Sequence, residues 1–397
     1  MRKQRVVITG MGIVCANAGN SREFAKALFE GKSGIRTCHA FDTTGLSTDC
    51  FGEVSALQAG NRFTELLEKS TKEMMDSAGV TSSMINRWGR NCRMFFGTLI
   101  FSSDYFYRHS LAKCKEQPAD DEIARINEYT DYAKELTGVR GNVNVISASC
   151  ASGTTAIGMA FDYLRSGLCE SAVAGGVDSL SLVTAYGFNA LKNMSSSVCN
   201  PFDQTRDGIT IGECGAMFLF ETLEHAKARG AKIIGEIAGY AIGNDAYHIT
   251  SPEPHGNGAY HTMQEALADA GITASDIDYI NAHGTGTLIN DDMELKAIER
   301  LLENTDHTVS VSSTKALLGH CMGASGAIEL ASILLSIKEE KYIPMPNLQK
   351  SIVQNKQIRM MSNTSSLWIN YALSNSFAFG GNSAAIVVKR YEGDGTA

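Results

Sequence analysis

The sequence predicts an α/β protein in which helices cover the sheets, and three observations support this fold class. Short β-branched runs alternate with longer amphipathic stretches along the chain, as in sheets layered with helices. The same alternation returns after about residue 240. The length of 397 residues, with 44% hydrophobic and 20% charged residues, allows a large packed core. We therefore expect two similar layered halves, residues 1–240 and 241–397.

The first half is expected to begin with a strand at residues 5–9 that ends in a glycine turn. A helix should follow over residues 21–30, with Ser21 as its N-cap. The charged, helix-prone stretch at residues 100–137 is interpreted as an insertion. The remaining elements of this half are strands at 142–146, 171–174 and 216–221, and a helix at 151–165.

The second half repeats this pattern of elements. It is expected to contain strands at 277–281, 309–312 and 384–388, and helices at 292–302 and 324–336. Residues 145–158 and 309–327 share one order: a strand, a tight polar turn bearing a reactive residue, and a helix of small residues. Each half also closes on an apolar strand. These echoes are weak in sequence, and we interpret them as the trace of a duplication.

Composition and charge exclude several classes of protein. The net charge of -8 gives no support to nucleic-acid binding, which needs a basic face. No stretch of about 18 apolar residues is present, so no membrane span is expected. A secretory signal is rejected because Thr9, Gly10 and Gly12 break the first apolar run. The 10 scattered cysteines contain no CxxC pair and favour a reducing cytoplasm over a zinc site or a disulfide framework.

Cys150 lies in the small-residue sequence at 146–153, between a β-rich run and a helical one. A thiol on a sharp strand-to-helix turn exposes its sulfur, and the helix N-terminus is expected to lower its pKa and raise the reactive thiolate fraction. The alternative is a buried structural cysteine, which is the ordinary role of a cysteine without partners.

Candidate partners for this thiol occur in three later segments. His283 follows a predicted strand and precedes a glycine turn. Lys315 and His320 lie in one segment, and Glu329 follows on the next helix. The small-residue turn at 375–382 offers backbone amides for an oxyanion hole. A single histidine or lysine is usually a core or solvated residue, but their occurrence together with a poised thiol indicates nucleophilic catalysis.

These motifs resemble the elongating β-ketoacyl-acyl-carrier-protein synthases, and the resemblance extends from residue 5 to residue 389. The resemblance implies the thiolase fold, with two duplicated halves in an α-β-α-β-α arrangement and the active site between them. It also implies that no cofactor is bound, because the phosphopantetheine of a carrier protein delivers the substrates. The matching segments are 7–12, 146–153, 200–203, 206–208, 281–287, 315–320 and 375–382.

The resemblance also implies the reaction and the residues of the catalytic set. Cys150 would hold an acyl group, and a malonyl thioester would lose CO₂ and attack it, as in fatty-acid or type II polyketide elongation. His283 and His320 would donate hydrogen bonds to the malonyl thioester carbonyl. Lys315 and Glu329 would form a supporting pair that orients the histidines.

Further roles follow from the same resemblance. The backbone amides of Cys150 and Phe379 would form the oxyanion hole, and Phe379 would gate the two half-reactions. Arg206 would contact the acyl carrier protein, with an intramolecular salt bridge as its alternative role. A homodimer or a heterodimer with a chain-length-factor-like subunit is expected.

Departures from the family pattern leave the acyl chain, the starter unit and the pathway open. Ala378 replaces the usual glycine, and Asn382 with Ser383 replaces the usual threonine and asparagine. The segment at 96–101 lacks the usual glycine-rich sequence.

Particular residues argue against rival functions. A dinucleotide-binding dehydrogenase fails because Cys15 occupies the third glycine position of GxGxxG. A degradative thiolase normally closes its site with a second cysteine, whereas His320 stands at the comparable place. A non-catalytic chain-length partner usually lacks the nucleophile that Cys150 supplies. A catalytic subunit that works only with such a partner remains an alternative.

Overall fold

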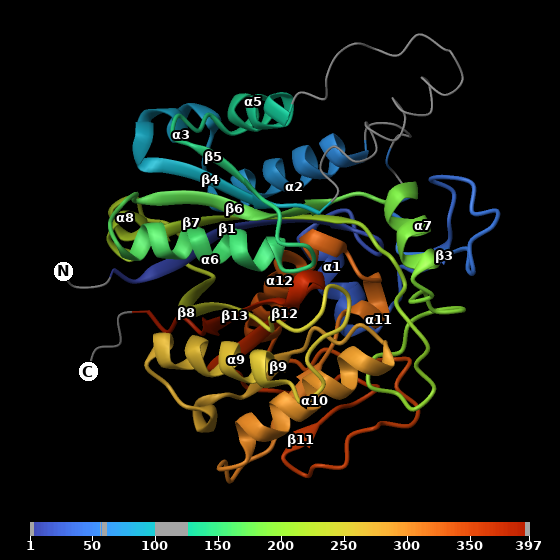
Figure 1. Cartoon of the computed structure of the whole chain (residues 1–397). Helices are drawn as coiled ribbons and strands as arrows, with labels where there is room; N and C mark the ends of the chain where they lie inside the picture. The colour runs from blue at the N-terminus through green and yellow to red at the C-terminus, as the bar shows by residue number, and fades with distance from the viewer. Residues whose placement is uncertain (1–3, 56, 58–61, 100–125, 394–397) are drawn as a thin grey trace, which may run out of the picture.

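The computed structural model describes residues 4–55, 57, 62–99 and 126–393 of the chain (Figure 1). Most of the predicted insertion at 100–137 lies outside these ranges. The strands of the first half are β1 (Val6–Cys15), β4 (Cys92–Gly97), β5 (Val143–Ile146), β6 (Ser171–Asp178) and β7 (Cys214–Thr222), with a small hairpin of β2 (Arg36–Thr37) and β3 (Cys50–Phe51). Its helices are α1 (Ser21–Phe29), α2 (Arg62–Ala78), α3 (Ser82–Trp88), α5 (Ile126–Thr137), α6 (Ser152–Arg165), α7 (Leu182–Ala190) and α8 (Leu223–Ala228).

The second half begins with a long strand and contains its own helices. Its strands are β8 (Gly235–Asn244), β9 (Tyr279–Asn281), β10 (Val309–Ser312), β11 (Ile358–Arg359), β12 (Tyr371–Phe377) and β13 (Asn382–Lys389). Its helices are α9 (Asn257–Ala270), α10 (Leu288–Leu302), α11 (Lys315–Leu318) and α12 (Ser325–Glu339). Among the helices of the described ranges, none has both the length and the apolar character needed to cross a membrane.

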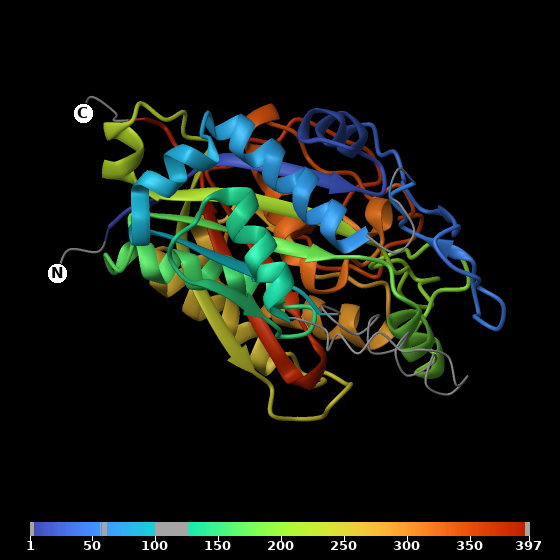
Figure 2. The ribbon, with the colours of Figure 1, turned by 90° about the horizontal axis from the view of Figure 1, so that it is seen from above.

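Strand β1 does not end at its glycines, so the predicted glycine turn is wrong. Figure 2 shows α2 lying over β1, and the two elements are in direct contact. A Cβ atom at Gly12 would overlap the backbone of α2 at Ser70. Gly10 likewise faces the backbone of Met74, so the glycines allow the close approach of the helix rather than a turn.

Helix α1 begins as predicted at Ser21, but Ser21 is not its N-cap. Asn20 is the cap residue, and its side-chain Oδ1 accepts a hydrogen bond of 2.9 Å from the backbone N of Glu23. The hydroxyl of Ser21 instead donates to Glu73 on α2, at 2.6 Å.

The two halves have the same topology. When the five principal strands of each half are numbered 1 to 5 along the chain, their order in the sheet is 3-2-4-5-1. This order is β5-β4-β6-β7-β1 in the first half and β10-β9-β12-β13-β8 in the second. In both, the first two neighbouring pairs are parallel and the last two are antiparallel. The expected duplication is therefore confirmed, and the boundary predicted at residue 240 lies within β8.

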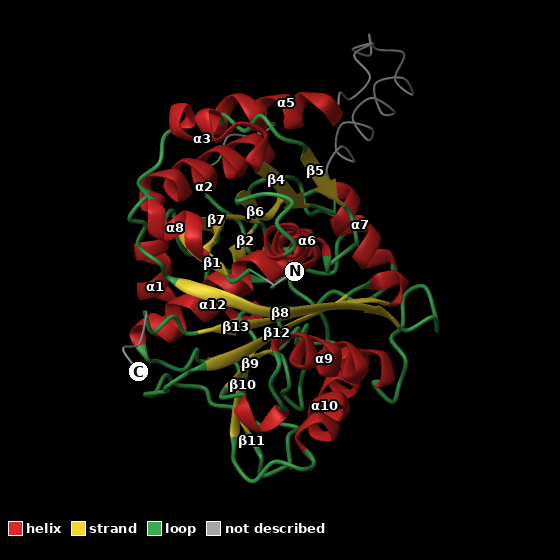
Figure 3. Cartoon of the chain, turned by 90° about the vertical axis from the view of Figure 1, so that its left-hand side faces the viewer, coloured by secondary structure: helices red, strands yellow, loops and turns green. Residues whose placement is uncertain are grey.

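Figure 3 shows the halves stacked as five layers. Helices α2, α3 and α5 cover the strands of the first half, α6 and α12 lie between the two sets of strands, and α9 and α10 cover the second set. A short antiparallel pairing of Val6–Ile8 with Gly235–Ile237 joins β1 to β8. The predicted α-β-α-β-α arrangement is thus confirmed.

The two central helices pack at very short range because small residues line their contact. A Cβ atom on Gly153 of α6 would lie 2.8 Å from the backbone oxygen of Gly323. A Cβ atom on Gly326 of α12 would overlap Thr154 of α6. Both helices follow the third strand of their half, so this contact brings the two equivalent turns of the duplicated fold together.

Replacing Gly326 by alanine should therefore destabilise the protein by roughly 1–3 kcal/mol, the usual cost of overpacking. Alanine normally stabilises a helix by about 1 kcal/mol relative to glycine, so a loss of stability in this variant would be due to the α6–α12 contact. Gly187 in α7 provides the control, because a Cβ atom there meets nothing within 4 Å. Urea denaturation should show a lower midpoint for Gly326→Ala and an unchanged or higher one for Gly187→Ala; equal midpoints would contradict the packing argument.

Candidate active site

Cys150 lies on a tight turn between β5 and α6, as the sequence predicts. Ser149 before it has a φ of 51°, a left-handed conformation that is uncommon outside glycine. Ser152 stabilises the turn, since its hydroxyl accepts from the backbone N of Ala148 at 2.8 Å and donates to the backbone O of Ser149 at 2.6 Å. The turn points the thiol toward the second half of the protein, and only 5% of the residue is exposed.

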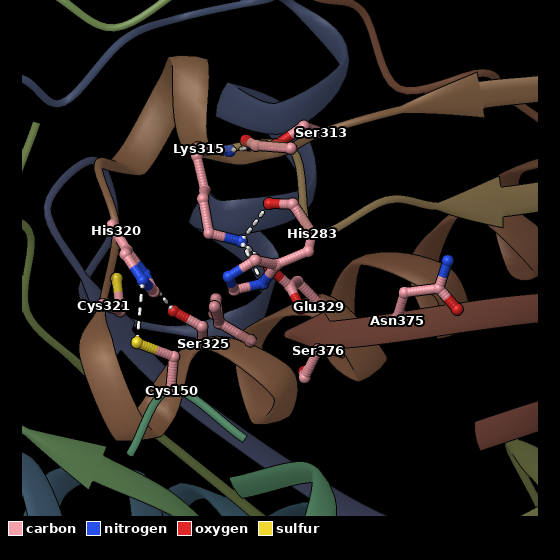
Figure 4. Close-up of polar contacts among 12 residues, drawn as sticks. Cys150, His283, Ser313, Lys315, His320, Cys321, Ser325, Glu329, Asn375 and Ser376 are labelled. Carbon is pink, nitrogen blue, oxygen red and sulfur yellow. Dashed lines mark hydrogen bonds and ion pairs between the residues drawn. The ribbon is translucent and has the colours of Figure 1, made fainter. Parts of the chain in front are cut away.

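His320 contacts this thiol directly. Its Nε2 atom lies 3.2 Å from Cys150 Sγ, and its Nδ1 atom lies 2.9 Å from the hydroxyl of Ser325 (Figure 4). The backbone N of His320 donates to Thr210 at 2.6 Å, and its backbone O accepts from Gly212 at 2.9 Å. The ring is therefore held from both the main chain and the side chain.

His283 lies beside His320, and a buried ion pair supports it from behind. The centres of the two imidazole rings are 5.2 Å apart, with the rings edge to face. Lys315 Nζ lies 2.5 Å from Glu329 Oε1, 2.6 Å from the backbone O of His283 and 3.4 Å from His283 Nδ1. The structure thus brings together the five residues expected to form the catalytic set.

Burial controls the protonation of these groups. It lowers the pKa of both His283 and His320 well below the usual range, and the positive charge of Lys315 acts in the same direction. Both rings are therefore neutral near pH 7. The pKa of Glu329 is raised by its burial, although Lys315 opposes this shift.

The expectation that the thiol of Cys150 has a lowered pKa is wrong. Burial raises the pKa of Cys150 to about 12, and the opposing charge of Lys315 does not compensate for it. Desolvation destabilises the buried thiolate more than the helix N-terminus stabilises it. The resting group is therefore a neutral thiol with a neutral imidazole beside it.

A cavity of about 380 Å³ opens onto the thiol and both histidines. Phe379, on the turn between β12 and β13, lines this cavity and stacks on Phe188 of α7, with ring centres 5.4 Å apart. Within the described part of the chain, the backbone N–H groups of Cys150 and Phe379 donate to no other residue's backbone, and that of Cys150 lies near its own thiol. Both amides are therefore available to a ligand, which is a requirement for an oxyanion hole.

The turn that carries Phe379 tolerates the alanine at position 378. Ala378 has an extended backbone with φ -136° and ψ 157°, which any residue adopts, and the two left-handed positions are occupied by Gly380 and Gly381. The side chain of Asn244 ties the turn to the end of β8, with hydrogen bonds to Gly380 O at 2.9 Å and Asn382 Oδ1 at 3.1 Å. The alanine therefore imposes no torsional strain.

Arg206 is not an exposed docking residue. Only 6% of it is exposed, and its guanidinium lies 2.6 Å from Asp292 and 3.7 Å from Asp291. It also donates to the backbone O of Asp203 at 2.9 Å. The intramolecular salt bridge, the alternative weighed for this residue, is what the structure shows.

Three residues of the site were missed by reading the sequence. Ser325 contacts His320, and Phe188 stacks on Phe379, but both contacts cross between segments without a local signal. Glu294 accepts hydrogen bonds of 2.8 Å from the backbone N atoms of His283 and Gly284. Glu294 lies two residues after Asp292 on α10, and a carboxylate in such an acidic stretch of helix is typical of a surface charge.

Family models cover most of the chain. The N-terminal domain model of beta-ketoacyl synthases matches residues 3–226, and the C-terminal domain model matches residues 234–349. The chain belongs to the β-ketoacyl synthase family. The resemblance seen in the motifs is thereby confirmed, and so is the expectation of an enzyme.

Curated relatives of this β-ketoacyl synthase carry the name 3-oxoacyl-[acyl-carrier-protein] synthase 2. The protein of Synechocystis sp. is 32% identical over an alignment that covers 99% of each chain. That of Staphylococcus aureus is 31% identical and covers 98% of this chain and 99% of its own. The Rhizobium meliloti protein reaches 42% identity, over 64% of this chain and 62% of its own.

Solved structures of ketosynthases have the same fold. The ishigamide ketosynthase/chain length factor matches with a TM-score of 0.91 and 29% identity, over 98% of this chain and 100% of that one. A type II PKS acyl-carrier protein in complex with its ketosynthase, bound to the hexaketide, matches with a TM-score of 0.89 and 28% identity over the same shares. A β-ketoacyl synthase from Burkholderia phymatum matches with a TM-score of 0.85 and 27% identity, again over 98% of this chain and 100% of that one. The predicted thiolase fold is therefore confirmed.

The protonation of Cys150 gives a direct test of the site's electrostatics. Because burial holds the thiol neutral, its alkylation by iodoacetamide should be slow at pH 7 and should still increase with pH up to at least about pH 9. Mass spectrometry of the peptide that contains Cys150 would measure the rate at each pH, with glutathione as the reference thiol. A rate above that of glutathione, unchanged between about pH 5 and 8, would instead indicate a preformed thiolate.

Proposed function

We propose that this β-ketoacyl synthase condenses an acyl group, held as a thioester on Cys150, with a malonyl group on an acyl carrier protein. The product is a β-ketoacyl thioester on the carrier, as in fatty-acid or type II polyketide chain elongation. The observation that carries this proposal is the 3.2 Å contact between His320 Nε2 and Cys150 Sγ, with His283 beside them in one cavity. A thiol and two neutral imidazoles suit acyl transfer followed by decarboxylation.

In the first half-reaction, Cys150 Sγ attacks the carbonyl carbon of the acyl thioester. The new bond joins that carbon to Sγ, and the bond to the carrier sulfur breaks. His320 is positioned to accept the thiol proton at Nε2 and to return it to the departing carrier thiol. The free amides of Cys150 and Phe379 are suited to bind the oxygen while it carries negative charge.

In the second half-reaction, a malonyl thioester loses CO₂ and its electrons remain as an enolate. His283 faces the cavity as a hydrogen-bond donor for the enolate oxygen, and its neutral state avoids a fixed charge that would retain the carboxylate. The enolate carbon attacks the acyl group and expels Cys150 Sγ. One proton taken up from solvent restores the thiol, so the cycle closes.

We further propose that the enzyme needs no bound cofactor and acts in the cytoplasm as a homodimer or with a chain-length-factor-like subunit. Relatives described as complexes with an acyl-carrier protein or a chain length factor support these partners. The intact Cys150 site favours a catalytic subunit over a non-catalytic partner. Activity of the purified chain alone would distinguish a homodimer from a subunit that requires a partner.

Replacing Cys150 by alanine should abolish condensation, with a loss of at least about a thousandfold, because no other group can hold the acyl intermediate. The assay would follow CO₂ release and β-ketoacyl product from acyl-carrier and malonyl-carrier protein. An unchanged melting temperature would show that the loss is chemical, since Cys150 contributes little volume to the core. Full condensing activity in this variant would contradict the proposed function.

Because Arg206 is engaged in its salt bridge, we propose a different cation, Lys192, as the one that the carrier meets at the entrance. Lys192 lines the cavity mouth, is exposed and forms no ion pair with a described residue. Exposed apolar side chains surround the same mouth, which is typical of a surface that meets a partner. These are Leu191, Ile249, Leu288 and Ile289, with exposed fractions of 46%, 77%, 58% and 56%.

Reversing the charge with Lys192→Glu should raise the KM for malonyl-carrier protein about five- to tenfold and leave kcat nearly unchanged, since one surface charge contributes about 1 kcal/mol. Lys192→Arg keeps the charge and should behave like the parent. The effect should shrink as salt is added. A KM unchanged by Lys192→Glu at low salt would exclude Lys192 from carrier binding.

A further inference from the structure

The two histidines differ in what lies against Nδ1. His283 Nδ1 faces the ammonium group of Lys315 at 3.4 Å. An ammonium group has hydrogen atoms to donate and no lone pair to accept with. A neutral His283 ring must therefore have Nδ1 unprotonated where it faces Lys315 and carry its hydrogen on Nε2. The Nε2–H group of His283 is thus a fixed hydrogen-bond donor.

His320 Nδ1 instead faces the hydroxyl of Ser325 at 2.9 Å. A hydroxyl donates or accepts, so it satisfies either tautomer of a neutral ring. Ser325 is 1% exposed, and it makes no other side-chain hydrogen bond to a described residue. The choice of tautomer then depends on the group at Nε2, which is Cys150 Sγ.

Cys150 favours a bare Nε2 on His320. The buried thiol keeps its hydrogen, and Sγ forms no side-chain hydrogen bond to a described residue other than His320. A thiol sulfur is a weak acceptor, whereas a bare imidazole nitrogen is a good one. The arrangement S–H···Nε2 therefore places the ring hydrogen on Nδ1, where Ser325 accepts it.

We propose that Lys315 and Ser325 hold the two catalytic histidines in opposite tautomers. Ser325 is then a positioning residue that presents the bare Nε2 of His320 to Cys150 as proton acceptor, while His283 presents Nε2–H to the enolate. This division, which builds on the proposed function, differs from the expectation that both rings donate to the malonyl thioester.

Under this scheme, the proton released by Cys150 during acyl transfer is returned to the departing carrier thiol. The proton leaves Cys150 Sγ for His320 Nε2, which makes the ring transiently cationic with Nδ1–H still bound to Ser325. The proton then moves from Nε2 to the sulfur of the departing carrier arm. The ring ends in the tautomer in which it began, ready for the next cycle.

Nitrogen NMR of the ¹⁵N-histidine-labelled full chain at pH 7 tests the tautomers without turnover, with His283→Asn and His320→Asn to assign the signals. His320 should carry hydrogen on Nδ1 and His283 on Nε2. Hydrogen on Nε2 of both rings would overturn the proposal. A chain with opposite tautomers that fails to condense would contradict the proposed function alone, so the two failures are distinguishable.

Kinetics of Ser325→Ala supply a second readout. Without the Ser325 hydroxyl, the Nδ1–H group of His320 has no acceptor, so acylation of Cys150 should slow about tenfold or more. Condensation from enzyme that has first been fully acylated should change by less than about threefold, because His283 carries that step. Ser325→Thr retains the hydroxyl and should restore acylation, which a merely structural role does not predict.

Ser332 provides the matched control, because it is a buried serine on the same helix. Among the described residues, its hydroxyl bonds only to Ile328 O of that helix, at 2.8 Å. Ser332→Ala should leave both half-reactions unchanged. Equal slowing of the two half-reactions in Ser325→Ala, or no slowing of acylation, would contradict the role of Ser325.

Discussion

The close contact between α6 and α12 is the constraint on which the rest of the structure depends. Each helix follows the third strand of its half, so each begins at the equivalent turn of a duplicated fold. Glycines at the crossing remove the side chains that would separate the helices. Cys150 lies at the start of one helix and His320 just before the other, and the packing therefore fixes the distance between sulfur and imidazole. The reactive pair is a product of the duplication rather than of either half alone.

Burial then determines the chemistry of this pair. Desolvation keeps the thiol and both rings neutral, so charge separates only while a substrate is reacting. The charge pair of Lys315 with Glu329, which lies beside these groups, is buried and hydrogen-bonded. Such a pair is weak evidence for stability, because desolvation offsets much of the attraction. Its contact with His283 makes orientation of that ring the better explanation for its presence.

Much of the fold and site followed from local sequence signals. Each predicted strand and helix has a counterpart in the structure, because β-branched runs and small-residue helices carry clear periodicities. Of the principal strands, β4, β8 and β12 were missed: the charged Arg93 interrupts β4, glycines interrupt β8 and buried polar residues interrupt β12. Helices α2, α3, α7, α8 and α9 were not predicted either. The nucleophile and its partners were recognisable from motifs. The contact of Ser325 with His320 and the pKa of Cys150 were not, because each depends on neighbours that only tertiary packing supplies. For the same reason, the sequence left the salt bridge of Arg206 as one of two alternatives.

Trapping the acyl intermediate tests the central claim most directly. Enzyme incubated with acyl-carrier protein, in the absence of malonyl substrate, would be digested and its cysteine peptides weighed by mass spectrometry. The acyl mass should appear on Cys150 and should disappear with formation of β-ketoacyl product only when malonyl-carrier protein is added. An acyl group on a different cysteine, or one that is lost to water without any condensation product, would contradict the account.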